Sequence, residues 1–131
     1  MKKISLFSVA LLIFVLIPVW AAAATVEGSV QGFNCVIAGK VCPIGKEDPM
    51  IAAERVFVVL TKDNDYYFVP NLSRGILARH INQMVRVTGK ISSKYKAIQA
   101  ETLEVLKKGS WKQTWSLEEE RRIYWGRGGS M

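Results

Sequence analysis

The chain has 131 residues, half of them hydrophobic, and carries a formal net charge of +7 at pH 7. This length is enough for one domain with one hydrophobic core. A basic surface favours anionic partners such as nucleic acid, acidic glycans or lipid headgroups, although the same charge can simply keep a small protein soluble.

The first 24 residues have the pattern of a signal peptide. Lys2 and Lys3 give a basic start, residues 4–19 are almost entirely apolar, and residues 22–24 fit an A-x-A cleavage site. The apolar run is shorter than the roughly 20 residues that a spanning helix needs. We therefore expect residues 1–24 to be cleaved and the protein to be periplasmic or secreted. An uncleaved, membrane-tethered form is the alternative.

Two β-rich regions come next. Residues 25–31 alternate between apolar and polar positions and predict a first strand, in which Gly28 is a candidate bulge. Residues 54–61 are dense in β-branched and aromatic side chains, which predicts a strand buried on both faces. A polar turn joins it to a returning strand at 66–69, so the two form a hairpin.

A short helix is predicted after Pro70, which ends the preceding strand because it has no amide hydrogen to donate. Asn71 and Ser73 are both candidate N-caps, and the apolar stripe continues to Ile81. Gly75 weakens this helix by about 1 kcal/mol relative to alanine.

Residues 84–91 have the clearest strand pattern in the chain. Val85, Val87 and Ile91 fall on one face, and polar or charged residues mostly occupy the other. Gly89 interrupts the apolar face, as a bulge or a sharp bend would.

The last strand of the domain is expected at 97–106, after a turn at 92–96. Its apolar positions change phase between Ala100 and Leu103, which again indicates a bulge. The predicted order is therefore three strands, one helix and two further strands.

This order, with the strand VRVTGKI followed by AIQAETLEVL, resembles the OB-fold superfamily, and secreted bacterial proteins with a single OB-like domain are the nearest comparison. The resemblance implies a mainly β fold: a five-stranded Greek-key barrel with one helix between strands 3 and 4. We assign this OB-like domain to residues 25–108. A split sheet with one packed helix is the structural alternative.

Residues 109–131 form a tryptophan-rich tail. Ser116 followed by Glu119 has the pattern of a capping box and predicts a short C-terminal helix at 117–125, before an end that we expect to be disordered. Exposed tryptophans are uncommon, so packing on the domain's own surface is favoured over contact with a partner. The candidate partner-binding residues are Trp111, Trp115, Tyr124 and Trp125.

Cys35 and Cys42 are the only cysteines, and an exported chain meets an oxidising compartment. We expect a disulfide between them, which would stabilise the fold by about 2–3 kcal/mol. A redox pair usually has only two intervening residues, and a zinc site needs more ligands. His80, the only histidine, is interpreted as a surface residue with a hydrogen-bond partner. No metal and no cofactor is predicted.

No motif for catalysis is present: the chain has no H-E-x-x-H, no P-loop and no G-x-S-x-G. A hydrolase that uses scattered carboxylates or a metal is the less favoured alternative to a binding protein. The OB resemblance implies a ligand on strands 2 and 3 and on the loops between strands 1 and 2 and strands 4 and 5. The predicted ligand-binding residues are Phe33, Lys40, Lys46, Tyr66, Arg86, Lys90, Lys94, Tyr95 and Lys96.

Cations interleaved with aromatic rings can hold a single strand of nucleic acid through phosphate contacts and base stacking. The sequence thus predicts an exported, non-enzymatic OB-like binding module. Its ligand would be anionic, either single-stranded nucleic acid or an acidic glycan, or else a protein. The alternative is an accessory subunit that docks into an envelope assembly through its tryptophan-rich tail.

Overall fold

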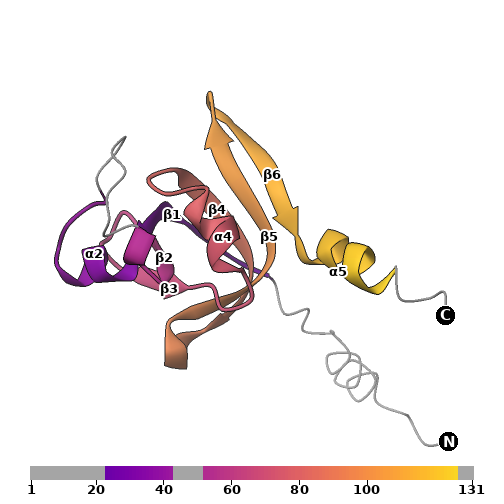
Figure 1. The fold of residues 1–131 in the computed structure, drawn as a ribbon, viewed down its shortest axis with the longest axis horizontal. Coiled ribbons are helices and arrows are strands. Elements are labelled where there is room, and N and C mark those ends of the chain that lie inside the picture. The colour runs from indigo at the N-terminus through magenta and orange to yellow at the C-terminus, as the bar shows by residue number, and fades with distance from the viewer. Residues whose placement is uncertain (1–22, 43–51, 127–131) are drawn as a thin grey trace, which may run out of the picture.

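The computed structural model describes residues 23–42 and 52–126, which are mainly β (Figure 1). The predicted signal segment up to residue 22, Lys46 and the glycine-rich end from residue 127 lie outside the described residues. The elements are β1 (Ala24–Gly32), α2 (Phe33–Ile37), β2 (Phe57–Leu60), β3 (Tyr66–Phe68), α4 (Arg74–Ala78), β4 (Met84–Ser92), η2 (Ser93–Tyr95), β5 (Ala97–Lys107), β6 (Ser110–Ser116) and α5 (Leu117–Trp125).

All six strands of the described part belong to one sheet, in the order β3-β2-β1-β4-β5-β6. Neighbours in this order pair antiparallel. In addition, β3 pairs in parallel with β5 through Phe68 and Ala97. This last pairing joins β1 to β5 into a closed cycle of neighbours, and β6 stands outside that cycle on β5.

The two edges of β5 explain where β6 lies. Because β4 occupies one edge along most of the strand, β3 and β6 must share the other edge. β3 covers its start at Ala97, and β6 covers it from Thr102 to Lys107. Asn71 fills the interval, since its Nδ2 donates to the Ala100 carbonyl at 2.7 Å and its Oδ1 accepts from the Ala100 amide at 2.8 Å. The Asn71 side chain thus satisfies the backbone of Ala100, which lies between the part of β5 paired with β3 and the part paired with β6.

The core is formed by apolar side chains from all six strands and from α4. Leu77 of α4 and Trp115 of β6 both join it. Burial of this apolar surface is the main source of stability in a domain of this size. The members with no exposed surface are Val30, Val59, Val85, Val87, Ile98, Ala100, Leu103 and Val105.

A single bulge accounts for two predictions made from separate strands. The β4–β5 register shifts between Thr88 and Gly89, and Glu101 of β5 is the extra residue. A side chain at Gly89 would collide with the β5 backbone at Gln99, so the close approach requires glycine. The bulges predicted at Gly89 and after Ala100 are therefore the same feature, and both predictions are confirmed.

Two placements on the strands differ from the predicted ones. Ile91 is 41% exposed instead of buried with Val85 and Val87, although its partner on β5, Ile98, is fully buried. Gly28 is not a bulge, since β1 keeps a regular register with both neighbours. A side chain at Gly28 would instead collide with the carbonyl of Leu60.

The helices also differ in part. α4 ends at Ala78, short of the predicted Ile81, and Ser73 caps it by accepting from the Ile76 amide. α2 lies between β1 and β2, where no helix was predicted, so the prediction of a single helix before the tail is wrong. α5 begins and ends as predicted, and Ser116 Oγ accepts from the Glu119 amide at 3.2 Å.

The sixth strand corrects the predicted count of five. Lys108 and Gly109, between β5 and β6, both have positive φ (50° and 76°), as the favoured two-residue hairpin turn requires. The domain boundary expected after Lys108 therefore falls in a turn between two paired strands. β6 and the start of α5 pack on the domain, with Trp115 and Leu117 at its core.

Candidate ligand-binding surface

Three aromatic rings from two distant segments meet beside β3. Phe33 opens α2, whereas Tyr66 and Phe68 alternate along β3 and leave Tyr67 between them to pack on the core. The ring centroids are 5.1 Å apart for Phe33 and Phe68, and 5.7 Å apart for the other two pairs. These separations suit edge-to-face aromatic contacts. We call the three half-buried rings the aromatic platform.

Strand pairing places a cation at this platform. The carbonyl of Lys96 accepts from the Phe68 amide at 2.8 Å, and Lys96 Nζ lies 4.8 Å from the centroid of the Tyr66 ring. Asp65 Oδ1 accepts from the same ammonium at 2.5 Å. This hydrogen bond lowers the pKa of Asp65 and raises the pKa of Lys96. Because both side chains are about half exposed, the pair is weak and can give way to an anionic ligand.

The turn before Lys96 extends the alternation of cations and rings. Lys94 Nζ lies 5.2 Å from the ring centroid of Tyr95, which is 64% exposed. Within residues 23–42 and 52–126, Lys94 forms no ion pair. A flexible ammonium and an accessible ring therefore lie within a few residues of the platform.

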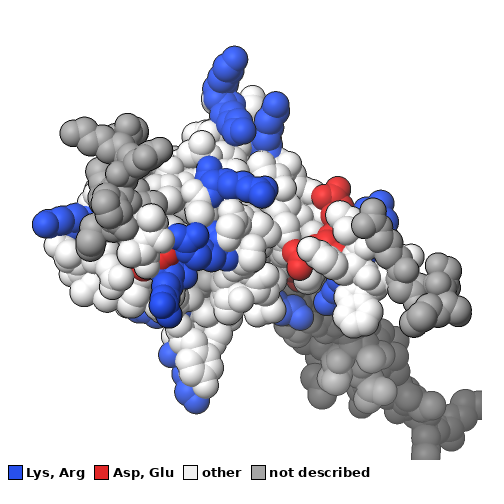
Figure 2. Space-filling view, in the orientation of Figure 1, with Lys and Arg blue, Asp and Glu red and all other residues white. Residues whose placement is uncertain are grey.

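A small hollow shares Phe68 with the aromatic platform. Its volume is about 220 Å³, and Arg55 and Arg74 contribute to its lining. The guanidinium of Arg74 lies 5.4 Å from the Phe57 ring centroid and donates to the carbonyl of Glu54 at 2.7 Å. On the visible face, basic side chains lie over the part that carries α2, β3 and α4 and also at the tip of the β5–β6 hairpin (Figure 2). Phe68 and Arg55 are additions to the predicted site.

The predicted ligand residues thus fall into separate groups. Phe33, Tyr66 and Lys96 come together at the platform, and Lys94 and Tyr95 adjoin them in the turn. Lys40 is exposed after α2, and Lys90 is exposed on β4. Neither of these two lysines forms a ring contact or an ion pair within the described residues.

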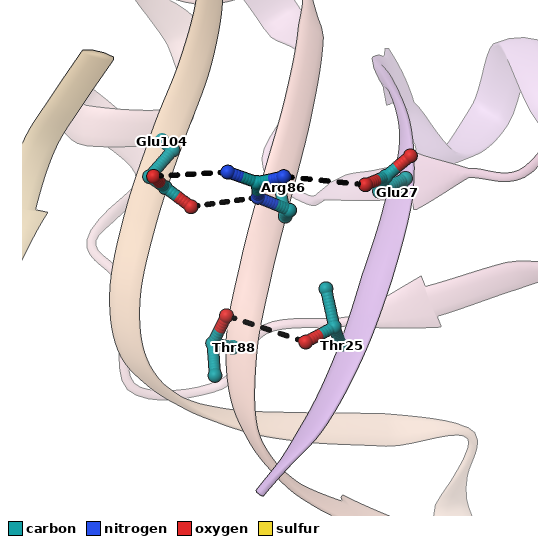
Figure 3. Close-up of polar contacts among 5 residues, drawn as sticks. All are labelled: Thr25, Glu27, Arg86, Thr88 and Glu104. Carbon is teal, nitrogen blue, oxygen red and sulfur yellow. Dashed lines mark hydrogen bonds and ion pairs between the residues drawn. The ribbon is translucent and has the colours of Figure 1, made fainter. Parts of the chain in front are cut away.

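Arg86 interacts with acidic side chains on the two neighbouring strands of the sheet (Figure 3). Its guanidinium forms two hydrogen bonds with Glu104, at 2.7 and 3.1 Å, and lies 3.7 Å from Glu27 Oε1. It also stacks 4.4 Å from the ring centroid of Trp111. The hydrogen bonds raise the pKa of Arg86 and lower the pKa of Glu104. Since Arg86 is already neutralised across three strands, we assign it to the sheet and not to a ligand.

The four aromatic residues predicted to bind a partner differ in how exposed they are. Trp115 is only 8% exposed, and its indole Nε1 donates to Glu120 Oε2 at 2.5 Å. Trp111 is half-buried beside Arg86. Tyr124 and Trp125 are 74% and 81% exposed, so they alone of the four are freely accessible.

The expected disulfide is not formed in the structure. Buried Cys42 instead has its own hydrogen bonds: its Sγ accepts from the Gly32 amide at 3.1 Å, and its amide donates to Gln31 Oε1 at 2.8 Å. Cys35 lies half-buried on α2. The thiol of Cys42 thus completes the hydrogen bonding at the end of β1.

His80 has a hydrogen-bond partner on the surface, with Nδ1 2.9 Å from Gln83 Oε1. In the described part of the chain, no group of three or more histidine, cysteine or acidic side chains is arranged to hold a metal ion. Likewise, none of the helices found there has the length and apolar character needed to span a bilayer.

Compared with known proteins, the chain matches no family model. No curated protein and no solved structure resembles it significantly. The functional argument therefore depends on the geometry of the site.

Proposed function

We propose that this chain is an exported, non-enzymatic OB-like binding module and that its ligand is single-stranded nucleic acid. The observation that carries the proposal is the aromatic platform with Lys96 beside it and Lys94 close by. Aromatic rings can stack with the bases of any nucleotide sequence, while ammonium groups contact the phosphates. The proposal that the chain is exported is based on the signal-peptide pattern of residues 1–24.

The strand pairings support the OB-like part of the proposal. A five-strand cycle with a helix between β3 and β4 is the arrangement expected of a partly open Greek-key barrel. In that fold, oligonucleotides bind on strands 2 and 3 and on the two loops that flank them. Here those positions are taken by Tyr66 and Phe68 on β3, Phe33 after β1, and the turn that contains Lys94 and Lys96.

The test is a titration of the full chain with a fluorescent oligothymidine of about 12 nucleotides, within the site size of one OB fold. Tyr66→Ala should weaken binding by about fivefold or more, the loss expected for one stacked base. Lys94→Glu with Lys96→Glu should weaken it further and reduce its salt dependence. Melting temperatures of all variants show whether the fold is kept.

A matched control is Lys107→Glu with Lys112→Glu, which makes the same change in charge on the exposed β5–β6 hairpin. It should reduce affinity much less than the pair at the platform. If both double variants lose the same affinity for the oligothymidine, the binding site does not lie at the aromatic platform. Binding of a polyuronic acid but not of the oligonucleotide would replace nucleic acid with an acidic glycan as the ligand.

A further inference from the structure

In the described chain, all residues of α5 except Leu117 and Glu120 are exposed. Leu117 packs against the core and Glu120 bonds to Trp115, so these two residues define the inward side of the helix. Glu118, Arg122 and Trp125 are spaced i, i+4 and i+7 and therefore share another side. All three are exposed, and Trp125 is 81% exposed. We call these three residues the α5 stripe.

The order of charges along the α5 stripe is self-complementary. Within the described residues, neither Glu118 nor Arg122 forms an ion pair. When an identical helix is laid antiparallel on this stripe, each Glu118 comes opposite an Arg122, and the two pairs are related by a twofold axis near the level of Glu120. A twofold interface needs this property, because the same patch must complement itself.

The same arrangement gives Trp125 a place to bind. Trp125 lies three residues beyond Arg122, about 4.5 Å farther along the helix axis. In the antiparallel arrangement, Trp125 of one copy therefore lies opposite the residue three positions before Glu118 of the other copy, at the end of β6. A hollow of about 600 Å³ lies between α5 and the β5–β6 pair and reaches Arg122. Apart from Leu117 its lining is polar or charged: Glu101, Thr102, Gln113, Ser116, Glu118, Glu119, Arg121 and Arg122.

We propose that a second copy of this chain docks antiparallel along the α5 stripe. Each Glu118 pairs with Arg122 of the other copy, and each Trp125 enters the hollow beside the other copy's α5. A nine-residue helix is only about 14 Å long, so this interface is at the small end of specific contacts. The dimer is therefore weak and reversible, and it forms on a different surface from the aromatic platform.

Charge reversal tests the pairing in the full chain, with the association measured by sedimentation velocity over a wide range of concentrations. Glu118→Arg and Arg122→Glu should each weaken self-association by about tenfold or more, because both symmetric pairs become repulsive. The double variant Glu118→Arg with Arg122→Glu should recover the wild-type dissociation constant. An equimolar mixture of the two single variants should form the heterodimer.

Recovery of association in the double variant would show that the single variants lost a contact between copies. If Glu118→Arg instead damaged α5 itself, the double variant would not recover, because it carries the same arginine in the first turn. Trp125→Ser should also weaken association, whereas Tyr95→Ser, another exposed aromatic residue outside the stripe, should not. A wild-type chain that stays monomeric at the highest concentration would overturn the proposal. So would single variants that associate as wild type does, or a double variant that fails to recover.

Discussion

At the residue scale, the cation best placed to contact a ligand is held by a carboxylate of its own chain. Lys96 lies over Tyr66 and bonds to Asp65 at 2.5 Å. Asp65 also accepts from the Tyr66 amide at 2.9 Å, so it fixes the turn that presents the ring. A phosphate that binds Lys96 must therefore compete with Asp65 and approach its negative charge.

This competition predicts a gain of affinity. Asp65→Asn should bind the oligothymidine about two- to fivefold more tightly at low salt, because it removes a repulsion and releases Lys96. Asp63→Asn makes the same change in net charge on an exposed residue of the turn, and should have a smaller effect. Fluorescence anisotropy measures both. Weaker binding by Asp65→Asn would show that the carboxylate mainly orients the site.

The Arg86–Glu104 pair predicts a specific dependence of stability on pH. The pKa of Glu104 is lowered in the folded state, so its contribution is present above the unfolded-state pKa and is lost as the pH falls through the lower folded value. The melting temperature of wild type should therefore fall more steeply in acid than that of Glu104→Gln. Glu101→Gln, at the exposed bulge, should keep the wild-type profile. Parallel profiles for all three proteins would contradict the assignment.

The sequence predicts some residue placements and not others. Alternation along a strand predicts that one of Tyr66 and Tyr67 points inward, and Tyr67 packs on the core. It also predicts that Arg86 points outward. It does not reveal that Glu27, Arg86 and Glu104 lie opposite one another, because cross-strand partners depend on the register of strands distant in sequence.

At the element scale, Asn71 fills a gap on the edge of β5 that no strand occupies. Its amide both donates to and accepts from Ala100, in the interval of β5 between the residues paired with β3 and those paired with β6. This use of Asn71 explains why Ser73, the other candidate, is the N-cap of α4. A side chain that both donates and accepts is required at this position.

Asn71→Asp should therefore destabilise the fold, although the two side chains have nearly the same shape. The carboxylate cannot donate to the Ala100 carbonyl, and a lost hydrogen bond of this kind costs about 1–3 kcal/mol. Asn64→Asp is the control, because Asn64 lies in an exposed turn with φ of 59°, a conformation that aspartate also tolerates. Urea denaturation gives both values. Equal stability of the two variants would mean that the Asn71 bridge contributes little.

A bulge explains why β6 was not recognised from the sequence. Trp111, Gln113 and Trp115 have the period of a single strand face, yet Leu103 pairs with Trp115 and Glu104 with Gln113, which leaves Thr114 as the extra residue. The shift places Trp115 in the core and Trp111 beside Arg86. α5 was predictable because its cap and its first turn are local features.

At the scale of the whole molecule, the inward face of β4 supports the entire strand cycle. Val87 has no exposed surface and lies between β1 and β5. Val87→Asp should unfold the domain, because it buries a charge without a partner. Thr88→Asp, one residue away on the opposite face, should retain a cooperative melt by circular dichroism. A normal melt for Val87→Asp would show that the inward face of β4 is assigned incorrectly.

The position of β6 has a consequence for how the chain is made. Until residue 116 has been synthesised, the second half of β5 presents a row of backbone amides and carbonyls with no partner strand. Such an edge recruits strands from other molecules. We therefore expect a chain that ends at Lys107 to aggregate instead of persisting as a smaller monomer, because this part of β5 would lack the partner strand that β6 provides.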